Sequence, residues 1–389
     1  MRTYAEWVFP GHPDKLSDRI ADAIVDEALS DDSDALVGIE VAVHRNKVFI
    51  DGRIACPHAQ SLDCREIARR VFRESGYNAL FLPDPEKLSI DTDLCVGDFR
   101  EDERRIRLIS DDQNIVTGYA ELNADANFLP VAHFVAYSIA REFYDRRKEN
   151  THIGPDGKVL VVLGNKGPVS GNRPEHYLEA VSFSVHHDQD LSTIEIVKFV
   201  KQVLESALAK IPSVPTRWNG GSGKTSVVVN GAGDFAVGGP EGDNGLAGKK
   251  LVVDAYGPHV PIGGGALSGK DPHKIDRAMA LRARQIAKHI VVSGVAERAL
   301  VRLAFVPGDK EPRWKDIALA KEDDRGSISV WPMDQTVAGR WLSGYDLTIE
   351  GTFKDLRLDE VRWSELAAWG HFTNPTVPWE SWSPGKATA

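Results

Sequence analysis

The stretch GGGALSGKDPHKIDR, at residues 263–277, is the most informative part of this chain. Its three consecutive glycines allow the backbone to approach a ligand closely. We expect a helix to begin directly after them, because Asp271 suits an N-cap and Pro272 suits a first turn. A helix N-terminus that is flanked by Lys270 and Lys274 is suited to bind a polyphosphate. The alternative is an ordinary surface loop before a basic helix.

A carboxylate lies among these cations. Asp276 follows Lys274 by two residues, within a long helix that we expect over residues 272–296. Because a carboxylate beside a phosphate site usually serves Mg²⁺, we interpret Asp276 as a metal ligand.

Length and composition are typical of a globular protein with more than one domain. The chain has 389 residues, more than one simple core usually holds. Its net charge of −10 argues against broad nucleic-acid binding, so an anionic ligand has to be held by local lysines and metal ions. No apolar run approaches a membrane span, and the N-terminus lacks the apolar core of a signal peptide. The three cysteines are not in metal-ligand spacing, which favours a reduced, cytoplasmic setting.

The order of the expected elements indicates α+β domains, because short pairs of strands are followed by helices three times. The expected elements are a helix at 14–29, a hairpin of strands 35–43 and 47–56, a helix at 59–75, a charged loop at 97–110, a helix at 128–148, strands at 158–163 and 177–184, a helix at 191–210, a linker at 212–223, two strands within 225–256 and the helix at 272–296. The predicted domains are 1–97, 112–229 and 230–380. The terminal PGKATA is expected to be disordered.

A second motif, GHPDK at residues 11–15, stands at the start of the first expected helix. Pro13 suits the first turn, while His12 and Asp14 project from the positive end of the helix dipole. We therefore favour a functional role for His12 and for Asp14, the latter as a metal ligand. Further aspartates follow at i,i+4 spacing, and we expect them on a solvated face: Asp18, Asp22 and Asp26.

A third motif is the glycine-rich turn GGPEGDNGLAGKK at 238–250. It ends in Lys249 and Lys250, which offer two more cationic ligands, and it precedes an apolar stretch that we expect to be a strand. Phe235, just upstream, is able to stack on a base, although a lone aromatic residue is more often part of a core.

Other patterns are open or excluded. The doubled carboxylate Asp111-Asp112 suits a substrate ammonium, a metal or an N-cap, and the residues alone do not choose between these roles. Two loops resemble a P-loop only in part: Trp218 replaces the first glycine of one, and Asp271 replaces the Mg²⁺-binding hydroxyl of the other. The chain has no HExxH motif, no nucleophile elbow and no GxGxxG after a strand. Zinc chemistry, acyl transfer and dinucleotide binding therefore have no support.

Taken together and in this order, the motifs resemble the S-adenosylmethionine synthetase (methionine adenosyltransferase) family. The matching pieces span nearly the whole chain: GHPDKLSDRIADAIVD at 11–26, GIEVAV at 38–43, SDDQNIVTGYA at 110–120, PDGK at 155–158, GGPEGDNGLAGKKLVVDAYG at 238–257, GGGALSGKDPHKIDR at 263–277 and GHFTNPTVPWE at 370–380.

This resemblance implies a fold and a reaction. The fold is three similar α+β domains in a pseudo-threefold arrangement, with the sheets packing at a dimer interface and the active sites between subunits. In the reaction, the methionine sulfur attacks the ribose C5′ of ATP, and the tripolyphosphate that leaves is cleaved to pyrophosphate and phosphate. The implied cofactors are two Mg²⁺ ions per site and K⁺. The implied assembly is a homodimer or a dimer of dimers in the cytoplasm.

The resemblance also assigns roles to residues, in addition to those derived above. His12 would stabilise the departing oxygen, with Lys158 and Lys270 as further catalytic residues. Asp14 and Asp276 would hold Mg²⁺, and Glu40 would belong to the K⁺ site. Asp112 would face the methionine ammonium. The implied ATP and phosphate ligands are Lys15, Lys158, Phe235, Asp243, Lys249, Lys250, Lys270 and Lys274.

The chain departs from the family pattern on the acceptor side. Arg53 stands where the family usually has a glutamate that binds the amino group of methionine, and it would repel that group unless rotated away. Asp234 and Lys249 replace arginines of the family motifs, and the loop between Cys95 and Asp112 is shorter than the family's gating loop. The leading hypothesis is adenosyl transfer to methionine. The alternatives are transfer to another thioether or other acceptor that suits Arg53, and a catalytically inactive polyphosphate-binding partner.

Overall fold

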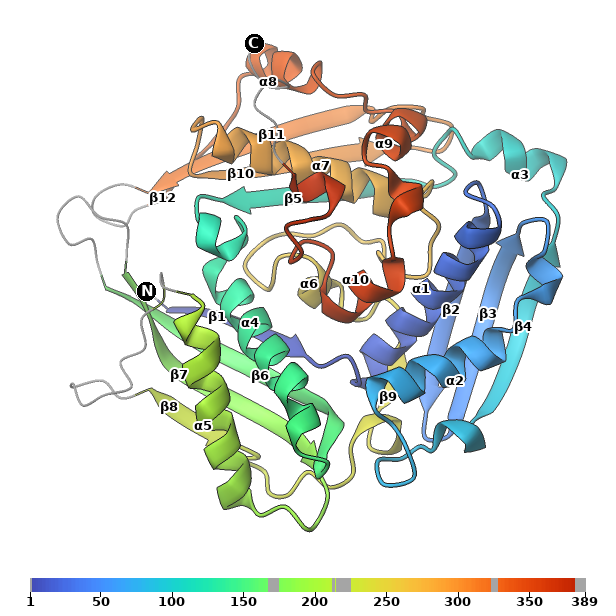
Figure 1. The fold of residues 1–389 in the computed structure, drawn as a ribbon. Coiled ribbons are helices and arrows are strands. Elements are labelled where there is room, and N and C mark those ends of the chain that lie inside the picture. The colour runs from blue at the N-terminus through green and yellow to red at the C-terminus, as the bar shows by residue number, and fades with distance from the viewer. Residues whose placement is uncertain (1, 167–174, 212–213, 215–224, 323–327, 382–389) are drawn as a thin grey trace.

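The computed structural model of the protein describes residues 2–166, 175–211, 214, 225–322 and 328–381 (Figure 1). Its strands are β1 (Arg2–Val8), β2 (Leu36–His44), β3 (Lys47–Ala55), β4 (Ser89–Gly97), β5 (Asn114–Glu121), β6 (Ile153–Lys166), β7 (Glu175–His187), β8 (Ser226–Val229), β9 (Asn244–Leu246), β10 (Arg298–Phe305), β11 (Trp314–Glu322) and β12 (Ile328–Pro332). Its helices are α1 (Pro13–Asp31), α2 (Cys64–Ser75), α3 (Glu101–Ile106), α4 (Val131–Arg146), α5 (Thr193–Ala209), α6 (Leu251–Asp254), α7 (Ile275–Val292), α8 (Gln335–Leu342), α9 (Ile349–Asp355) and α10 (Trp363–Trp369).

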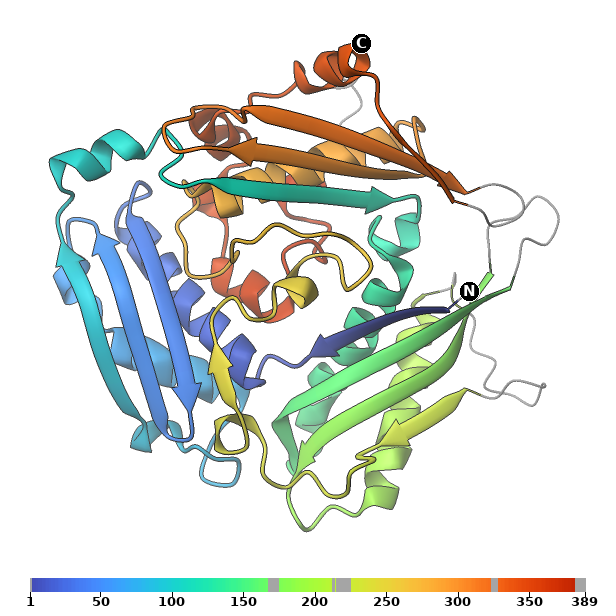
Figure 2. The same cartoon turned by 180° about the vertical axis from the view of Figure 1, so that it is seen from behind.

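Three sheets of four strands form the frame of the described part of the chain, in the orders β4-β3-β2-β9, β1-β6-β7-β8 and β12-β11-β10-β5. They are arranged around a centre that contains α6 and α10 (Figures 1 and 2). Helices α1 and α2 cover the first sheet, α4 and α5 the second, and α7 the third, each over its own apolar core. The expected fold of three α+β domains is thereby confirmed.

The sheets exchange strands in a cycle. Strand β1 leaves the N-terminal segment to pair with β6, β5 leaves the central segment to pair with β10, and β9 leaves the C-terminal segment to pair with β2. The domain boundaries 1–97, 112–229 and 230–380 therefore stay a prediction, because each sheet takes one strand from a neighbouring segment. The expected linker at 212–223, apart from residue 214, and the terminal PGKATA lie outside the described residues.

Several expected elements appear with small shifts. Helix α1, the hairpin of β2 and β3, and helices α4 and α5 lie within a few residues of their predicted positions. The strands predicted at 158–163 and 177–184 are the middles of the longer β6 and β7. The helix predicted at 59–75 is divided into a 3-10 turn, Ala59–Ser61, and α2, because Asp63 caps α2 through the Glu66 amide.

Three predictions about local structure are wrong. The charged loop at 97–110 contains α3, whose acidic first turn and basic last turn suit the helix dipole. The stretch LVVDAYG forms the short helix α6 rather than a strand. Helix α7 begins at Ile275 and not near Pro272, after an extended Lys274. The carboxylate of Asp271 caps only the turn before the helix, through the His273 amide at 2.9 Å, and it also accepts the amide of Val37 at 2.9 Å and pairs with Arg107 at 2.8 Å.

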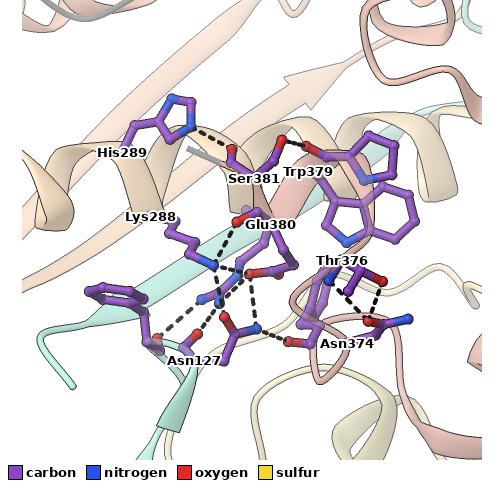
Figure 3. A network of polar contacts seen from close by, with 12 residues as sticks. Asn127, Lys288, His289, Asn374, Thr376, Trp379, Glu380 and Ser381 are labelled. Carbon is purple, nitrogen blue, oxygen red and sulfur yellow. Dashed lines mark hydrogen bonds and ion pairs between the residues drawn. The ribbon is translucent and has the colours of Figure 1, made fainter. Parts of the chain in front are cut away.

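The C-terminal tail is held against α7 by a buried ionic network (Figure 3). The carboxylate of Glu380 accepts hydrogen bonds from Arg284 at 2.8 and 3.0 Å, from Lys288 at 2.8 Å and from Asn127 at 3.2 Å. Asn127 also donates to the carbonyl of Phe372. This network ties the end of the chain to the third sheet and to the turn before α4.

Candidate active site

The first charged cluster lies at the N-terminus of α1. His12 is the N-cap, and its Nδ1 accepts the backbone amide of Asp14 at 3.2 Å. Tyr77, which directly follows the C-cap of α2, fixes the turn before His12: its hydroxyl donates to the carbonyl of Gly11 at 2.5 Å. His12 is 2% exposed. The GHPDK motif is therefore a helix start with a buried imidazole as its cap.

The protonation of His12 follows from this geometry. Because Nδ1 accepts a hydrogen bond, the proton of a neutral ring lies on Nε2. Burial lowers the pKa of His12 to about 3, and the neighbouring Lys158 and Lys250 act in the same direction. At pH 7 the ring is neutral and presents its Nε2–H as a hydrogen-bond donor.

Asp14 links this cap to the glycine-rich turn at 238–250. Its Oδ1 accepts the amide of Leu246 at 3.0 Å, and its Oδ2 pairs with Lys250 at 2.8 Å. Lys249 lies 3.7 Å from Oδ1. Burial acts to raise the pKa of Asp14, but the hydrogen bonds from Lys250 and Leu246 outweigh it and lower the pKa. The paired lysines thus lie beside Asp14, in the region of His12.

The other residues predicted for this half of the site lie nearby or at its rim. Lys158 is exposed on β6, where it is opposite Val8 of β1, and its charge acts on His12. Phe235 is half-buried, and its ring centroid is 5.6 Å from that of His186. Asp243 is exposed and accepts the amide of Asn244.

The second charged cluster lies at the turn before α7. Lys270 pairs with Asp276 at 2.5 Å, and Lys274 pairs with Asp111. Oδ1 of Asp276 is buried and has no hydrogen-bond partner among the described residues. The backbone of Lys270 bridges to Gly38, two residues before Glu40 on β2. The structure therefore brings Lys270, Lys274, Asp276 and Glu40 to one region.

Helix α1 sets the distance between the two clusters. Asp14 holds the amide of Leu246 in the first loop, and Asp22 holds the amide of Gly269 in the second at 2.8 Å. From position 14 to position 22 an α-helix rises about 12 Å. The two clusters are therefore distinct in this chain, and both lie along the edge of β2 that faces away from β3, where β9 and Lys270 pair.

The structure places Lys15 differently from the expectation. Its ammonium is buried and pairs with Asp18 at 3.1 Å and with Asp254 of α6. Burial acts to lower the pKa of Lys15, but the two carboxylates outweigh it and raise the pKa. Lys15 thus holds α6 beneath the site, instead of extending toward a phosphate.

The aspartates expected on a solvated face are also buried, so that prediction is wrong. Asp18 and Asp22 are 0% exposed and Asp26 is 9% exposed. Each is buried because it accepts backbone amides from another segment: Gly248, Gly269 and Trp363, respectively. The i,i+4 spacing places the aspartates on one face of α1, but the sequence does not show that other segments cover this face or which amides the aspartates meet.

Arg53 is bound within the chain. Its Nε and Nη2 each donate to the carboxylate of Glu103 at 2.8 Å, while its remaining N–H groups donate to the carbonyls of Ile54, Cys95 and Asp98. All five donors of the guanidinium are thereby used. The hydrogen bonds from Arg53 lower the pKa of Glu103 to about 2. The charge of Arg53 is balanced by the carboxylate of Glu103 on α3, a contact that the sequence did not indicate.

Asp112, the residue predicted to face the methionine ammonium, is exposed at the start of β5 and accepts the amide of Gln113. Its neighbour Asp111 makes the contact with Lys274. This doubled carboxylate therefore lies at the second cluster, with one member paired and the other facing solvent.

Sequence profiles of three domains match the chain in succession. They are those of the N-terminal, central and C-terminal domains of S-adenosylmethionine synthetase, which match residues 2–94, 107–235 and 237–381. The chain belongs to the S-adenosylmethionine synthetase family. The predicted family, and with it the enzyme class of methionine adenosyltransferases, is confirmed.

Curated members of the S-adenosylmethionine synthetase family are similar over almost their whole length. The S-adenosylmethionine synthase of Mesoplasma florum is 31% identical over 97% of this chain and 96% of its own. That of Staphylococcus epidermidis is 32% identical over 97% and 94%. That of Deinococcus radiodurans is 30% identical over 98% and 96%. In the described part of this family member, no helix has the length and apolar character needed to cross a membrane.

Proposed function

We propose that the protein transfers the adenosyl group of ATP to the sulfur of L-methionine, and that the tripolyphosphate released is cleaved to pyrophosphate and phosphate. The observation that carries this proposal is the neutral, buried His12 beside Asp14 and Lys250. The sulfur lone pair forms the new S–C5′ bond while the C5′–O5′ bond breaks, and its electrons move to O5′. A thioether nucleophile loses no proton in this step, so the site needs no general base.

The residues of the first cluster suit the departing oxygen. His12 has one free donor, Nε2–H, and a hydrogen bond from it to O5′ would strengthen as negative charge develops there. A neutral donor keeps this role over a wide pH range, because a pKa of about 3 leaves the ring uncharged. Lys249, Lys250 and Lys158 would neutralise the phosphates. Lys270 and Lys274 would do the same from the second cluster.

Two carboxylates are the proposed Mg²⁺ ligands. Oδ1 of Asp276 is a buried oxygen without a partner among the described residues, and Asp14 is a buried, ionised carboxylate that accepts the amide of Leu246 and pairs with Lys250. Both suit a hard cation, so the residues fit two Mg²⁺ ions per site. Bound Mg²⁺ would supply charge stabilisation at the phosphoryl oxygens. Glu40, on the outer side of β2 opposite Asp51, is the proposed K⁺ ligand.

We propose that a second copy of the chain completes each site. The two clusters are anchored to α1 at points about 12 Å apart, so a group as small as one phosphate does not meet both. Helices leave one side of the three sheets uncovered (Figure 2). By the alternation of side chains along the strands, that side carries exposed apolar residues from all three sheets: Tyr4, Leu160, Val228, Phe49, Leu246, Ile115, Trp314 and Val330. Such a surface fits an isologous homodimer, in which the first cluster of one copy faces the second cluster of its partner.

The proposed acceptor is methionine, because Arg53 carries no uncompensated charge. Its five donors are satisfied within the chain, and its carboxylate partner comes from α3. The acceptor-side hypothesis based on repulsion by Arg53 therefore loses its physical basis. No observation favours the inactive polyphosphate-binding alternative, since His12, Asp14, Lys270 and Asp276 are all present in their clusters.

A product assay tests the function. The protein is incubated with ATP, Mg²⁺ and K⁺, with and without methionine, and the products are followed by mass spectrometry. We expect S-adenosylmethionine, pyrophosphate and phosphate only when methionine is present. Turnover that requires a different acceptor, or no turnover at all, would contradict the proposal. Omission of K⁺ and of Mg²⁺ in parallel reactions tests the two cofactors.

A charge swap tests the role of Arg53. Arg53→Glu alone places two carboxylates together, so we expect methionine KM to rise. The double variant Arg53→Glu with Glu103→Arg restores an ion pair, and coupling energies of about 0.5–3 kcal/mol are typical for such neighbours. Recovery of methionine KM in the double variant supports an internal role for Arg53. A lower methionine KM in Arg53→Glu alone would indicate that the acceptor does meet position 53.

Sedimentation of the wild-type protein and of Leu160→Arg tests the dimer. Leu160 is 41% exposed on β6 and lies opposite Glu6 of β1, so an arginine there gains a cross-strand partner in the folded chain. We expect a dimeric wild type and a variant that dissociates at higher concentration. A monomeric wild type that is fully active would contradict the shared site.

A further inference from the structure

Helix α1 carries four aspartates one turn apart, and each accepts a backbone amide from the C-terminal half of the chain. Asp14 meets Leu246, Asp18 meets Gly248 at 2.7 Å, Asp22 meets Gly269 at 2.8 Å, and Asp26 meets Trp363 at 2.7 Å. Like charges at i,i+4 spacing repel one another on an isolated helix. Their burial together is therefore maintained by the contacts that they make.

Asp18 holds the turn that carries the paired lysines. Its Oδ1 accepts the amide of Gly248, and its Oδ2 accepts from the buried Lys15 at 3.1 Å. Gly248 has a φ of 80°, which side-chain-bearing residues rarely adopt. The amide of Gly248 belongs to the residue directly before Lys249 and Lys250. The position of both ammonium groups thus depends on the carboxylate of Asp18.

Asp22 makes the equivalent contact at the second cluster. Its Oδ1 accepts the amide of Gly269, the residue directly before Lys270. Gly269 has a φ of 81°, and a Cβ atom there would clash with the carbonyl oxygen of Ile39. Both oxygens of Asp22 also accept from Arg277, at 2.6 and 2.7 Å, and Arg277 donates to the carbonyl of Lys270.

We infer that Asp18 and Asp22 are positioning residues for the phosphate-binding lysines. Asp18 fixes Lys249 and Lys250, and Asp22 fixes Lys270, through the positive-φ glycine that precedes each. Helix α1 thereby sets the separation of the two cationic clusters. This inference rests on the proposed function only for the nature of the ligand, because the contacts themselves are made within the chain.

Asp26 provides a matched control. It is on the same face of α1, is 9% exposed, and accepts the amides of Trp363 and Ser364 and the hydroxyl of Ser364. The segment that it holds is the start of α10, which carries no lysine. Trp363 packs on Arg277, which donates to the carbonyl of Lys270, so Asp26 is a control for the first cluster. Its loss removes a comparable set of buried hydrogen bonds without touching the turn that carries Lys249 and Lys250.

The experiment compares Asp18→Ala, Asp18→Asn and Asp26→Ala with the wild-type protein. Affinity for inorganic tripolyphosphate is measured by calorimetry, ATP KM and kcat by the product assay, and folding by thermal unfolding. An asparagine still offers an oxygen to Gly248 but loses the charge that pairs with Lys15. We expect Asp18→Ala to weaken tripolyphosphate binding and raise ATP KM by about ten- to a hundredfold, the range seen when a binding group is misplaced. We expect Asp18→Asn and Asp26→Ala to stay within about threefold of wild type, even where their unfolding temperature falls.

Hydrogen exchange separates this inference from the proposed function. The amide of Gly248 is expected to exchange faster in Asp18→Ala and at the wild-type rate in Asp26→Ala. If Asp18→Ala and Asp26→Ala change affinity and exchange alike, the positioning role is overturned. If the wild type neither binds tripolyphosphate nor turns over, the proposed function fails, and the exchange of Gly248 alone then decides the positioning role. If Asp18→Ala does not fold, Asp18→Asn must retain tripolyphosphate affinity, and its loss would overturn the inference.

Discussion

Helices α1 and α7 are both buried and both strongly charged. Their buried charges have opposite signs and bind different parts of the molecule. Helix α1 buries aspartates that bind backbone amides of the two lysine-bearing loops. Helix α7 buries cations, namely Arg277, Arg282, Arg284 and Lys288. Of these, Arg284 and Lys288 bind the C-terminal tail, and Arg282 binds α9. Only Arg277 joins the two sets, through its bidentate pair with Asp22.

This difference separates function from stability. Asp18 and Asp22 on α1 accept the amide of the residue directly before a predicted phosphate ligand, so their loss should move the site. The cations on α7 other than Arg277 hold the tail or α9, so their loss should lower stability without altering the chemistry of the folded molecules. The comparison is tested by variants of each helix and of its partners.

The largest expected effect on stability comes from Glu380→Ala. The change leaves Arg284 and Lys288 buried without their carboxylate, and breaking a buried ion pair in this way costs about 3–5 kcal/mol. Urea unfolding measures the loss, and kcat per folded molecule is expected to be unchanged. Glu350→Ala is the control, because Glu350 pairs with Lys354 in solvent and such exposed pairs contribute about 0.2–1 kcal/mol. Equal losses in the two variants would contradict the assigned role of the network.

The buried network of α7 could not be predicted from the sequence, although the fold around it could. The order of strands and helices, the hairpin and the three-domain fold were predictable from hydrophobic periodicity, turn residues and family motifs. The ionic contacts of α7 were not, because they join Arg284 to Glu380, far apart in the chain. The sequence offers no rule that selects one carboxylate among many for a buried cation. Asp271 illustrates the same limit: local capping rules predict its contact with the following turn, which His273 makes, but not its tertiary contacts with Val37 and Arg107.

The largest expected effect on catalysis comes from His12→Asn. An asparagine side chain still accepts the Asp14 amide as an N-cap, so the helix start is retained. The Nε2–H donor is lost, and removal of one donor to a developing oxyanion costs about 2.7–4 kcal/mol, a fall in kcat of about a hundred- to a thousandfold. We expect ATP KM to change little and the free energy of unfolding to stay near wild type. A kcat close to wild type would remove His12 from the mechanism.

A smaller effect is expected from pH. Between pH 6.5 and pH 3 the unfolded chain binds a proton at His12 that the folded chain does not, because burial lowers the folded pKa to about 3. This residue therefore reduces stability as pH falls below 6.5, and it has no such effect above 6.5. At pH 5 the difference amounts to about 2 kcal/mol at most. We expect His12→Asn to lose less unfolding free energy than wild type between pH 7 and pH 5. Equal losses would show that His12 gains a proton in the folded state.

The residues of the candidate site were predictable in part. His12, Asp14, Lys249, Lys250 and Lys270 were identified from glycine-rich turns and helix starts, and the structure gathers them into two clusters. The supporting residues were not identified. Asp18 and Asp22 were read as a solvated face, because the spacing of like charges on a helix does not reveal that a loop from the other half of the chain covers them.

The smallest expected effect comes from Arg282→Met on α7. Arg282 donates to Gln285 at 2.7 Å and pairs with Asp355 at 3.0 Å. Asp355 is 39% exposed, so water takes the place of the guanidinium and no charge is left buried. The flexible methionine fills most of the volume. We therefore expect a loss of about 1–2 kcal/mol in unfolding free energy, less than for Glu380→Ala, with unchanged ATP KM. A loss as large as that of Glu380→Ala would mean that removal of a buried cation is itself costly, whether or not its partner is left buried and unpaired. The contrast between the two helices would then need another cause.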